Sequence, residues 1–197
     1  MISFSQCKGE PAMPERKDYI ELFDNLFPNF FTWDSIRAIP DDHICEEMIL
    51  DLRAFSPDEV KIDIPEGITF GFFHGNLDDL RRSVAEVDDS WVRYYNDPSR
   101  AFCAFDGERV VSFCDVDEMG TVPFMGKTVK VGGPGCVGTI PSYRRRGIGL
   151  RMVQLATGIL KDRGFDYSFI HYTGVARWYA KLGYETVLRW NGKGFVD

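Results

Sequence analysis

The sequence has few cysteines and no long apolar run. Its five cysteines are widely spaced and form no C-x-x-C pair, which excludes a disulfide framework and disfavours a zinc site, so we expect buried thiols. No apolar stretch approaches the roughly 18 residues that a membrane helix needs. The first residues show no basic segment followed by an apolar one, so no secretory signal is expected and the cytoplasm is the expected compartment.

Disorder and low complexity are also absent from the composition. Of the 197 residues, 44% are hydrophobic and 14% aromatic, which is enough to bury a core. The net charge of −7 is unevenly placed, since residues 120–197 carry 12 Lys/Arg against 4 Asp/Glu and residues 1–66 carry 6 against 15. This distribution predicts an anion site late in the chain and a surface that tolerates cations earlier, and it disfavours nonspecific binding of nucleic acid.

The first 66 residues differ in character from the rest. Aromatic and aliphatic residues cluster between Leu22 and Trp33 with a break at Pro28, and the segment from His43 to Phe55 places apolar residues near one helical face. We therefore expect one or two helices here, in an acidic, aromatic-rich extension (residues 1–66) that packs on a main domain (residues 67–197).

From residue 67 the pattern alternates between strand-like and helix-like segments, which indicates an α+β fold. Asp106-Gly107 is a turn signal between two apolar runs and predicts a hairpin. The strongest helical periodicity covers residues 146–163 and is followed by Gly164, which favours a left-handed cap. The remaining expected elements are strands over 67–75, 129–139, 165–172 and 184–190 and helices over 77–87, 90–96 and 174–182.

The segment from Cys136 to Met152 carries the most informative chemistry. A strand is expected to end before Pro141, and a helix to open at the run Arg144–Gly149. The first turn of a helix leaves about four backbone N–H groups free and carries about half a positive charge. Glycines at 147 and 149 let a phosphate approach this backbone, and three arginines add positive field. The segment predicts a pyrophosphate cradle.

Two other glycine patterns are rejected. Residues 133–138 fit G-x-G-x-x-G, but the segment that follows contains Pro141 and no helix opens directly after the pattern. Gly126-Lys127-Thr128 resembles the end of a P-loop, but Thr121 stands where its first glycine belongs. Neither dinucleotide nor ATP binding is therefore expected from these motifs.

The motif Arg144-x-x-Gly147-x-Gly149 and a second landmark, Trp178-Tyr179-x-x-x-Gly183-Tyr184, together resemble the GNAT superfamily of acyl-CoA-dependent N-acetyltransferases. The resemblance covers roughly residues 67–197. It implies a mixed, mostly antiparallel sheet flanked by helices, here with the helical N-terminal extension, and acetyl-CoA as co-substrate without a metal.

The resemblance also implies roles for individual residues. Backbone groups of Val137, Gly138 and Thr139 would bind the pantetheine arm by extending the sheet. Tyr179 would protonate the departing thiolate as general acid, after an amine has attacked the acetyl carbonyl directly. The pyrophosphate would lie on the N–H groups of the residues that open the helix, with the arginine side chains adding charge: Arg144, Arg145, Arg146, Gly147, Ile148, Gly149 and Leu150.

The base that deprotonates the amine is left open. The acidic run Asp115, Asp117 and Glu118 and the lone histidine of the second half, His171, are the candidates. The sequence departs from the family pattern at Tyr172, where an asparagine is common, and in lacking a glutamate on the fourth strand of the family fold. The chain also ends soon after the final strand, so the extension or a second subunit, as in a homodimer, is expected to complete the sheet.

The expected function is acetyl transfer to a primary amine of an unidentified acceptor, a small molecule or a peptide, and the acidic surface favours a cationic one. Two alternatives stay open: a catalytically degenerate acyl-CoA-binding sensor or interaction module, and an acyltransferase that uses a different acyl-CoA.

Overall fold

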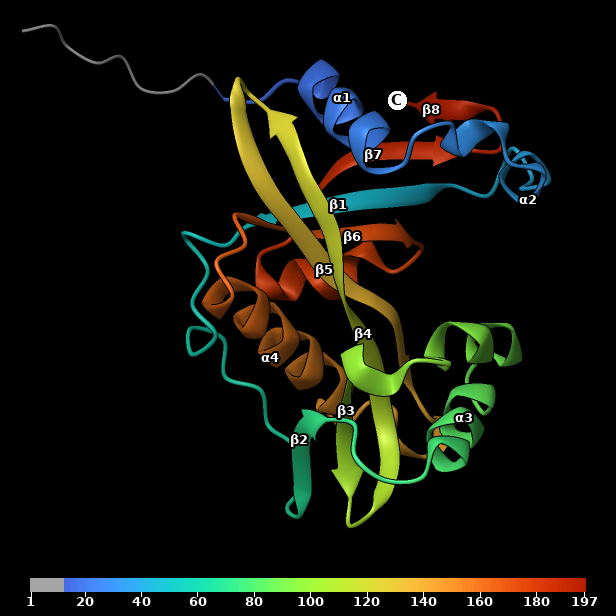
Figure 1. Cartoon of the computed structure of the whole chain (residues 1–197), viewed down its shortest axis with the longest axis vertical. Coiled ribbons are helices and arrows are strands. Elements are labelled where there is room, and N and C mark those ends of the chain that lie inside the picture. The colour runs from blue at the N-terminus through green and yellow to red at the C-terminus, as the bar shows by residue number, and fades with distance from the viewer. Residues whose placement is uncertain (1–12) are drawn as a thin grey trace, which may run out of the picture.

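The computed structural model describes residues 13–197, which form one eight-stranded sheet with helices on both faces (Figure 1). The strand order is β2-β3-β4-β5-β6-β1-β7-β8. The strands are β1 (Cys45–Asp51), β2 (Ile68–Phe72), β3 (Ala101–Asp106), β4 (Arg109–Phe124), β5 (Lys127–Thr139), β6 (Tyr167–Thr173), β7 (Glu185–Asn191) and β8 (Gly194–Val196). The helices are α1 (Arg16–Leu26), α2 (Asp34–Arg37), α3 (Leu77–Ala85), α4 (Ile148–Asp162) and α5 (Ala176–Tyr179), with 3-10 turns at Phe30–Thr32, Asp89–Tyr95, Pro98–Arg100, Pro141–Tyr143 and Ala180–Leu182.

The sheet is antiparallel except between β5 and β6, which run parallel. This confirms the expected α+β class with a mostly antiparallel sheet. The predicted hairpin is β3–β4, with Gly107 in the left-handed region. The predicted long helix is α4, which ends one residue before Arg163 and is followed by Gly164 at φ 76°.

The helix expected within His43–Phe55 is wrong, because this segment forms β1. The strand lies between β6 and β7 and pairs antiparallel with both. The expectation that the extension or a second subunit completes the edge beside the last strand is wrong, because β8 pairs with the outer side of β7, whereas β1 of the extension lies inside the sheet. The division of the chain into residues 1–66 and 67–197 stays a prediction.

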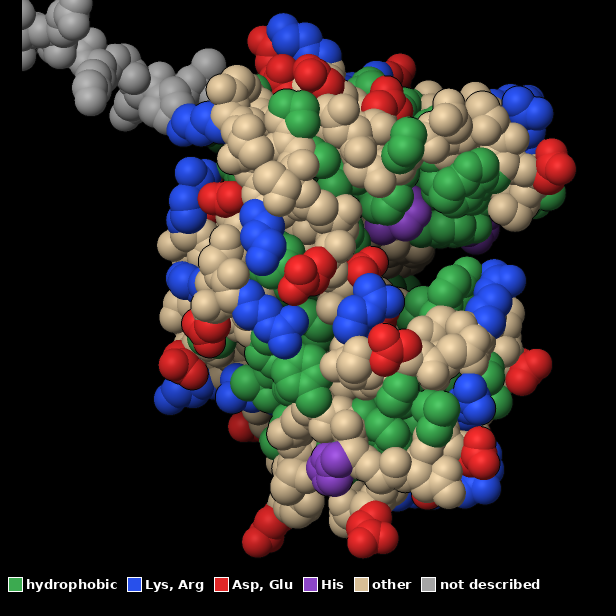
Figure 2. Space-filling view, viewed as in Figure 1, with side chains coloured by type: hydrophobic (Ala, Val, Ile, Leu, Met, Phe, Trp, Pro, Cys, Tyr) green, Lys and Arg blue, Asp and Glu red, His purple; other side chains and the backbone are tan. Residues whose placement is uncertain are grey.

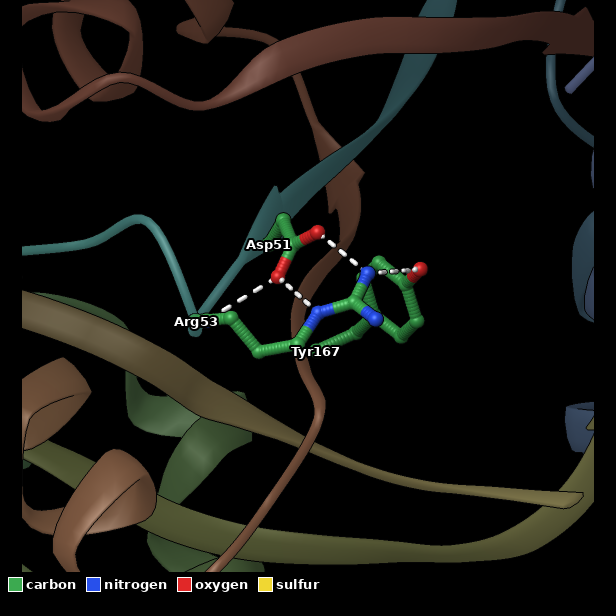
Figure 3. A network of polar contacts seen from close by, with 3 residues as sticks. All are labelled: Asp51, Arg53 and Tyr167. Atoms are coloured by element: carbon green, nitrogen blue, oxygen red, sulfur yellow. Dashed lines mark hydrogen bonds and ion pairs between the residues drawn. The ribbon is translucent and has the colours of Figure 1, made fainter. Parts of the chain in front are cut away.

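A polar network ties the end of β1 to the start of β6 (Figure 3). The Arg53 guanidinium donates to the Asp51 carboxylate at 2.9 Å through Nε and to the Tyr167 hydroxyl at 3.0 Å. The hydrogen bonds from Arg53 hold the pKa of Asp51 below its usual range. Because Arg53 is largely exposed, the network contributes little to stability, and its main effect is to align the two strands.

The helices occupy opposite faces of the sheet. On one face α4 packs through Met152, Ala156 and Leu160 against β4. On the other face α1 packs on β5 and β7 at one end of the sheet, and α3 packs on β3 at the other end. Within residues 13–197 no α-helix covers the face between α1 and α3, and Figure 1 shows these two helices well apart. Within residues 13–197, no helix has the length and apolar character to cross a bilayer.

Candidate functional site

A gap between β5 and β6 divides the sheet at its centre. The two strands pair only through Val131 with Tyr167 and Gly132 with Ser168. β5 then bends away through Pro134, which has no N–H, and through Cys136 at φ 45°, while it stays paired with β4 as far as Thr139. Among the described residues, the edge of β5 that faces β6 over residues 134–139 therefore has no strand partner. The stretch predicted to bind an extended arm, Val137–Thr139, lies on this edge.

The loop that opens α4 contains a run of successive backbone N–H groups at the start of the helix. Arg145 and Gly147 both adopt left-handed backbone conformations, with φ of 62° and 78°. The first N–H of this turn with a backbone acceptor is that of Arg151, which donates to the Gly147 carbonyl at 2.9 Å. In the described chain, the N–H groups of residues 145–150 have no backbone acceptor. Successive unpaired N–H groups with left-handed residues among them form an anion-binding nest, and the helix dipole reinforces it.

The two glycines of the cradle are fixed by close packing. A Cβ at Gly147 would lie 2.3 Å from the carbonyl oxygen of Asp63, and a Cβ at Gly149 would lie 2.6 Å from the Thr139 hydroxyl. Glycine at these two positions was predicted because it clears space for a ligand, and the structure gives a second reason for it. The chain itself approaches so closely at these two positions that no other residue fits without a shift.

The three arginines of the cradle are exposed and differ in their contacts. The Arg144 side chain donates through Nε to the Thr139 carbonyl at 3.0 Å, which ties the loop to the end of β5. The Arg146 guanidinium lies over the Tyr143 ring, 5.2 Å from its centroid. Arg145 makes no such contact among the described residues. Among residues 13–197 no acidic side chain forms an ion pair with these three arginines, so their positive field is available to an anion.

Tyr179 lies on the α4 face of the sheet, in a core cluster with Val153 and Ile170. It is 6% exposed, and burial is the main cause that raises the pKa of its phenol well above the ordinary value. Within residues 13–197 its hydroxyl has no hydrogen-bond partner, and the hydroxyl oxygen is not completely buried. The hydroxyl therefore keeps its proton at neutral pH and is free to donate it.

The acidic run expected near the site is already paired with cations. Arg100 lies between Asp115, at 2.9 Å, and Asp117, and Arg163 lies 3.8 Å from Glu118. Burial raises the pKa of Asp115 to about 6, against the opposing effect of Arg100. Asp115 and Asp117 are therefore a compensated pair that shares Arg100, and Glu118 is paired separately at the end of α4. The pull of these acids on a cationic acceptor is weaker than the sequence suggested.

The raised pKa of Asp115 predicts a pH-dependent stability difference. A carboxyl whose pKa is higher in the folded than in the unfolded chain binds more protons when folded, so it destabilises the fold as pH rises from about 4 to about 6. The free energy of unfolding of Asp115→Asn, relative to the parent, is expected to rise by about 1–2 kcal/mol over this window, since solvent screens part of the shift. Denaturant titrations at several pH values measure it, and a pH-independent difference would contradict it.

His171 lies near the end of β6 on the α1 face of the sheet, where the carboxylate of Glu47 contacts it. Its Nδ1 lies 3.0 Å from both carboxylate oxygens of Glu47, which is fully buried in β1. The ring of Phe27, the residue that follows α1, stacks on the imidazole with centroids 4.0 Å apart. Figure 2 shows the molecule hollowed between the half that holds β1, β7 and α1 and the half that holds α3, with hydrophobic side chains along the rim.

Sequence reasoning placed His171 among the base candidates but missed Glu47. The only available signal was an acid inside the apolar run Cys45–Leu52, and a helical interpretation of that run puts Glu47 on the exposed side. Across residues 13–197, no group of three or more His, Cys, Asp or Glu side chains lies close enough to hold a metal ion.

Comparison with known proteins was made on sequence and on structure. The family model for the "Acetyltransferase (GNAT) domain" matches residues 76–187, more than half of the chain. A search of curated proteins found no match.

Solved structures share the fold. A GCN5-related glucosamine N-acetyltransferase region in a fungal multi-domain GH3 β-N-acetylglucosaminidase is 20% identical over 92% of this chain and 23% of that chain, with a TM-score of 0.61. GCN5-related N-acetyltransferases from Sphaerobacter thermophilus (23% identity, 77% of this chain and 50% of that chain, TM-score 0.53) and Kribbella flavida (19%, 75% and 56%, 0.50) are also similar. This chain spans at most 56% of the length of these three proteins.

Proposed function

This chain belongs to the GNAT acetyltransferase family, and from that premise we propose that it transfers the acetyl group of acetyl-CoA to a primary amine. The observation that carries the proposal is the nest of six N–H groups at residues 145–150, beside the unpaired edge of β5. A diphosphate fits the nest because it is an anion with several acceptor oxygens. An extended pantetheine arm fits the strand edge because its amides can replace the missing neighbour.

The reaction proposed is a direct transfer through the gap between β5 and β6. The nitrogen lone pair of the amine forms a bond to the thioester carbonyl carbon, and the carbonyl electrons move to oxygen, where an amide N–H of β5 would stabilise the charge. When the intermediate collapses, the C–S bond breaks and the thiolate takes a proton from Tyr179. The acceptor nitrogen must lose a proton in the same sequence.

Two alternatives have weaker support. A degenerate binder of acyl-CoA would keep the cradle and not need the Tyr179 hydroxyl, which is nevertheless unbonded within the described residues. The alternative of a larger acyl group rested on the glycines of β5, but an added Cβ at Gly133 would lie 1.9 Å from the Phe169 carbonyl oxygen. That glycine serves close packing of two strands and does not widen the site.

The proposal is tested by reversing the charge of the cradle. We expect the double variant Arg144→Glu, Arg146→Glu to bind coenzyme A about 10²-fold more weakly than the parent in calorimetry, because two favourable charge contacts become repulsions. The loss should shrink as salt is added, since both side chains are exposed. The parent should release thiol from acetyl-CoA when a panel of primary amines is supplied.

The matched control carries the same change in net charge elsewhere. Lys17 and Lys127 are exposed cations outside the cradle, and Lys17→Glu, Lys127→Glu should bind coenzyme A within about twofold of the parent. Equal weakening in both double variants would reduce the cradle to a general charge effect. Absence of coenzyme A uptake by the parent would remove the proposed function.

A further inference from the structure

We propose that Glu47 and His171 act as a pair, in which His171 takes the proton of the acceptor amine and Glu47, supplied by the N-terminal strand β1, is the positioning residue that holds the imidazole for this task. The inference rests on the proposed function, because it names the base that the transfer to an amine requires.

Glu47 has the contacts of a residue that orients an imidazole. Its carboxylate has no exposed surface, and three donors converge on it. The Trp190 indole N–H lies 2.6 Å away, the Tyr172 backbone N–H 3.1 Å away, and His171 Nδ1 3.0 Å from both oxygens. A carboxylate that faces three donors acts as an acceptor, so the imidazole proton belongs on Nδ1. The lone pair of neutral His171 is then on Nε2.

The imidazole is held in place and yet reaches solvent. Phe27 stacks on the ring at 16° between planes, and Phe30 packs edge-on with centroids 5.0 Å apart. The side chain nevertheless remains 23% exposed. Among residues 13–197, Nε2 has no hydrogen-bond partner, because every hydrogen bond of the ring is made by Nδ1. A fixed ring with one free nitrogen toward solvent is the geometry of a general base.

Both strands leave regular geometry where the pair forms. The register of β1 shifts at Glu47–Met48 against both of its neighbours, and Glu47, Met48 and Ile49 are consecutive buried residues. A β-bulge of this kind turns a side chain that would otherwise follow the alternation. On β6, Tyr172 adopts φ 57°, which is unusual for a residue with a side chain. Such departures persist where the surroundings impose them, and they concentrate at functional sites.

The pair lies across the sheet from Tyr179. Phe169 and His171 point to the α1 face, where they contact its aromatic residues, whereas Ile170 packs with Tyr179 on the α4 face. A thioester in the gap between β5 and β6 would therefore have its sulfur toward the acid and its carbonyl open to an amine that arrives from the base. The acceptor ammonium gives a proton to Nε2, the imidazolium releases it to water, and the free amine forms the C–N bond. The nitrogen of the intermediate then loses a second proton to Nε2, and after the C–S bond breaks water returns a proton to Tyr179, so that one proton is released overall.

Asp115 is the competing base and is less suited. Its carboxylate is 2.9 Å from the Arg100 guanidinium, so protonation there would break an ion pair. Proton transfer to His171 instead creates a cation beside the buried carboxylate of Glu47, which stabilises it. Proton transfer to His171 therefore strengthens its interaction with Glu47, whereas proton transfer to Asp115 would weaken its interaction with Arg100.

The first experiment compares the full chain with His171→Gln, Glu47→Gln and the neighbouring control Glu46→Gln, using the best acceptor from the amine panel. We expect kcat/KM to fall about 10²-fold in His171→Gln and about tenfold or more in Glu47→Gln, with coenzyme A binding unchanged. Glu46, which bonds Arg189 and Thr186 at the surface, should be replaceable within about twofold.

The pH profile separates a proton acceptor from a merely structural residue. The titratable groups that face His171 are Glu47 and Cys45 of β1 and Tyr172 of β6, while α1 and the Phe30–Thr32 turn present phenylalanine rings and β7 presents Trp190. The parent and His171→Gln should differ in the shape of their pH–rate profiles. The His171→Gln rate should keep rising until the amine itself loses its proton.

A spectroscopic measurement keeps the inference separate from the proposed function. Imidazole 15N spectra of the parent should show neutral His171 as the Nδ1–H tautomer, and Glu47→Gln should populate the Nε2–H form. If the parent acetylates amines but His171→Gln is within twofold with the same pH profile, the inference is overturned. It is equally overturned by an Nε2–H tautomer in the parent. If no amine of the panel is acetylated, the proposed function is removed. The tautomer of His171 still shows whether Glu47 orients the imidazole.

Discussion

A chain that lacks residues 1–52 is expected not to fold. β1 pairs with β6 on one side and β7 on the other, so its removal leaves two central strand edges without partners. It also removes the buried side chains of Met48 and Leu52 from two core clusters. Each large apolar side chain lost from a core costs about 2–5 kcal/mol, and a small domain has only about 5–15 kcal/mol in total.

Circular dichroism and denaturant titration of the fragment measure this outcome, with single substitutions to grade it. Met48→Ala in the full chain should lower the free energy of unfolding by about 2–5 kcal/mol, whereas Glu46→Gln on the same strand should change it by less than about 1 kcal/mol. A fragment of residues 53–197 that unfolds cooperatively would contradict the prediction. It would instead support a division of the chain near residue 66 into two independently folding units.

The misreading of β1 has a physical cause. A regular strand alternates with period two, but the bulge at Glu47–Met48 places Met48 and Ile49 next to each other on buried sites. Together with Ile44 and Leu52, this gives apolar spacings of 4, 1 and 3, which are those of a helix. The local pattern was therefore ambiguous, and the deciding information was the vacant place between β6 and β7, which lies more than a hundred residues away.

The cradle and the surroundings of His171 also differ in how far they could be predicted from local sequence. The cradle could be predicted because its parts, the glycines, the arginines and the helix opening, are adjacent in sequence and act through the backbone. The contacts of His171 could not, because the acid that orients it comes from a strand 124 residues earlier in the chain. The arginine that compensates Asp115 likewise comes from another element, the 3-10 turn Pro98–Arg100 that precedes β3. Charge counted along the chain does not reveal such pairing.

Replacement of Tyr179 by phenylalanine is expected to lower kcat for amine acetylation about 10³-fold with no change in coenzyme A binding. The hydroxyl is the only group removed, and it would otherwise give its proton to the thiolate as the C–S bond breaks. Because burial raises the pKa of this phenol, with Tyr184 adding to the effect, it should stay protonated past pH 10. The parent should then show no alkaline loss of rate from Tyr179 below that pH.

Tyr184 supplies the matched control, because it lies in the same core cluster but its hydroxyl is hydrogen-bonded. Its hydroxyl contacts Thr157 at 2.8 Å and Ser168 at 2.7 Å, whereas the Tyr179 hydroxyl has no partner within the described residues. Tyr184→Phe should lower the free energy of unfolding by about 1 kcal/mol or more and keep the activity, and Tyr179→Phe should do the reverse. Equal activity in the parent and Tyr179→Phe would mean that solvent protonates the thiolate, and loss of stability in Tyr179→Phe would assign the residue to the core.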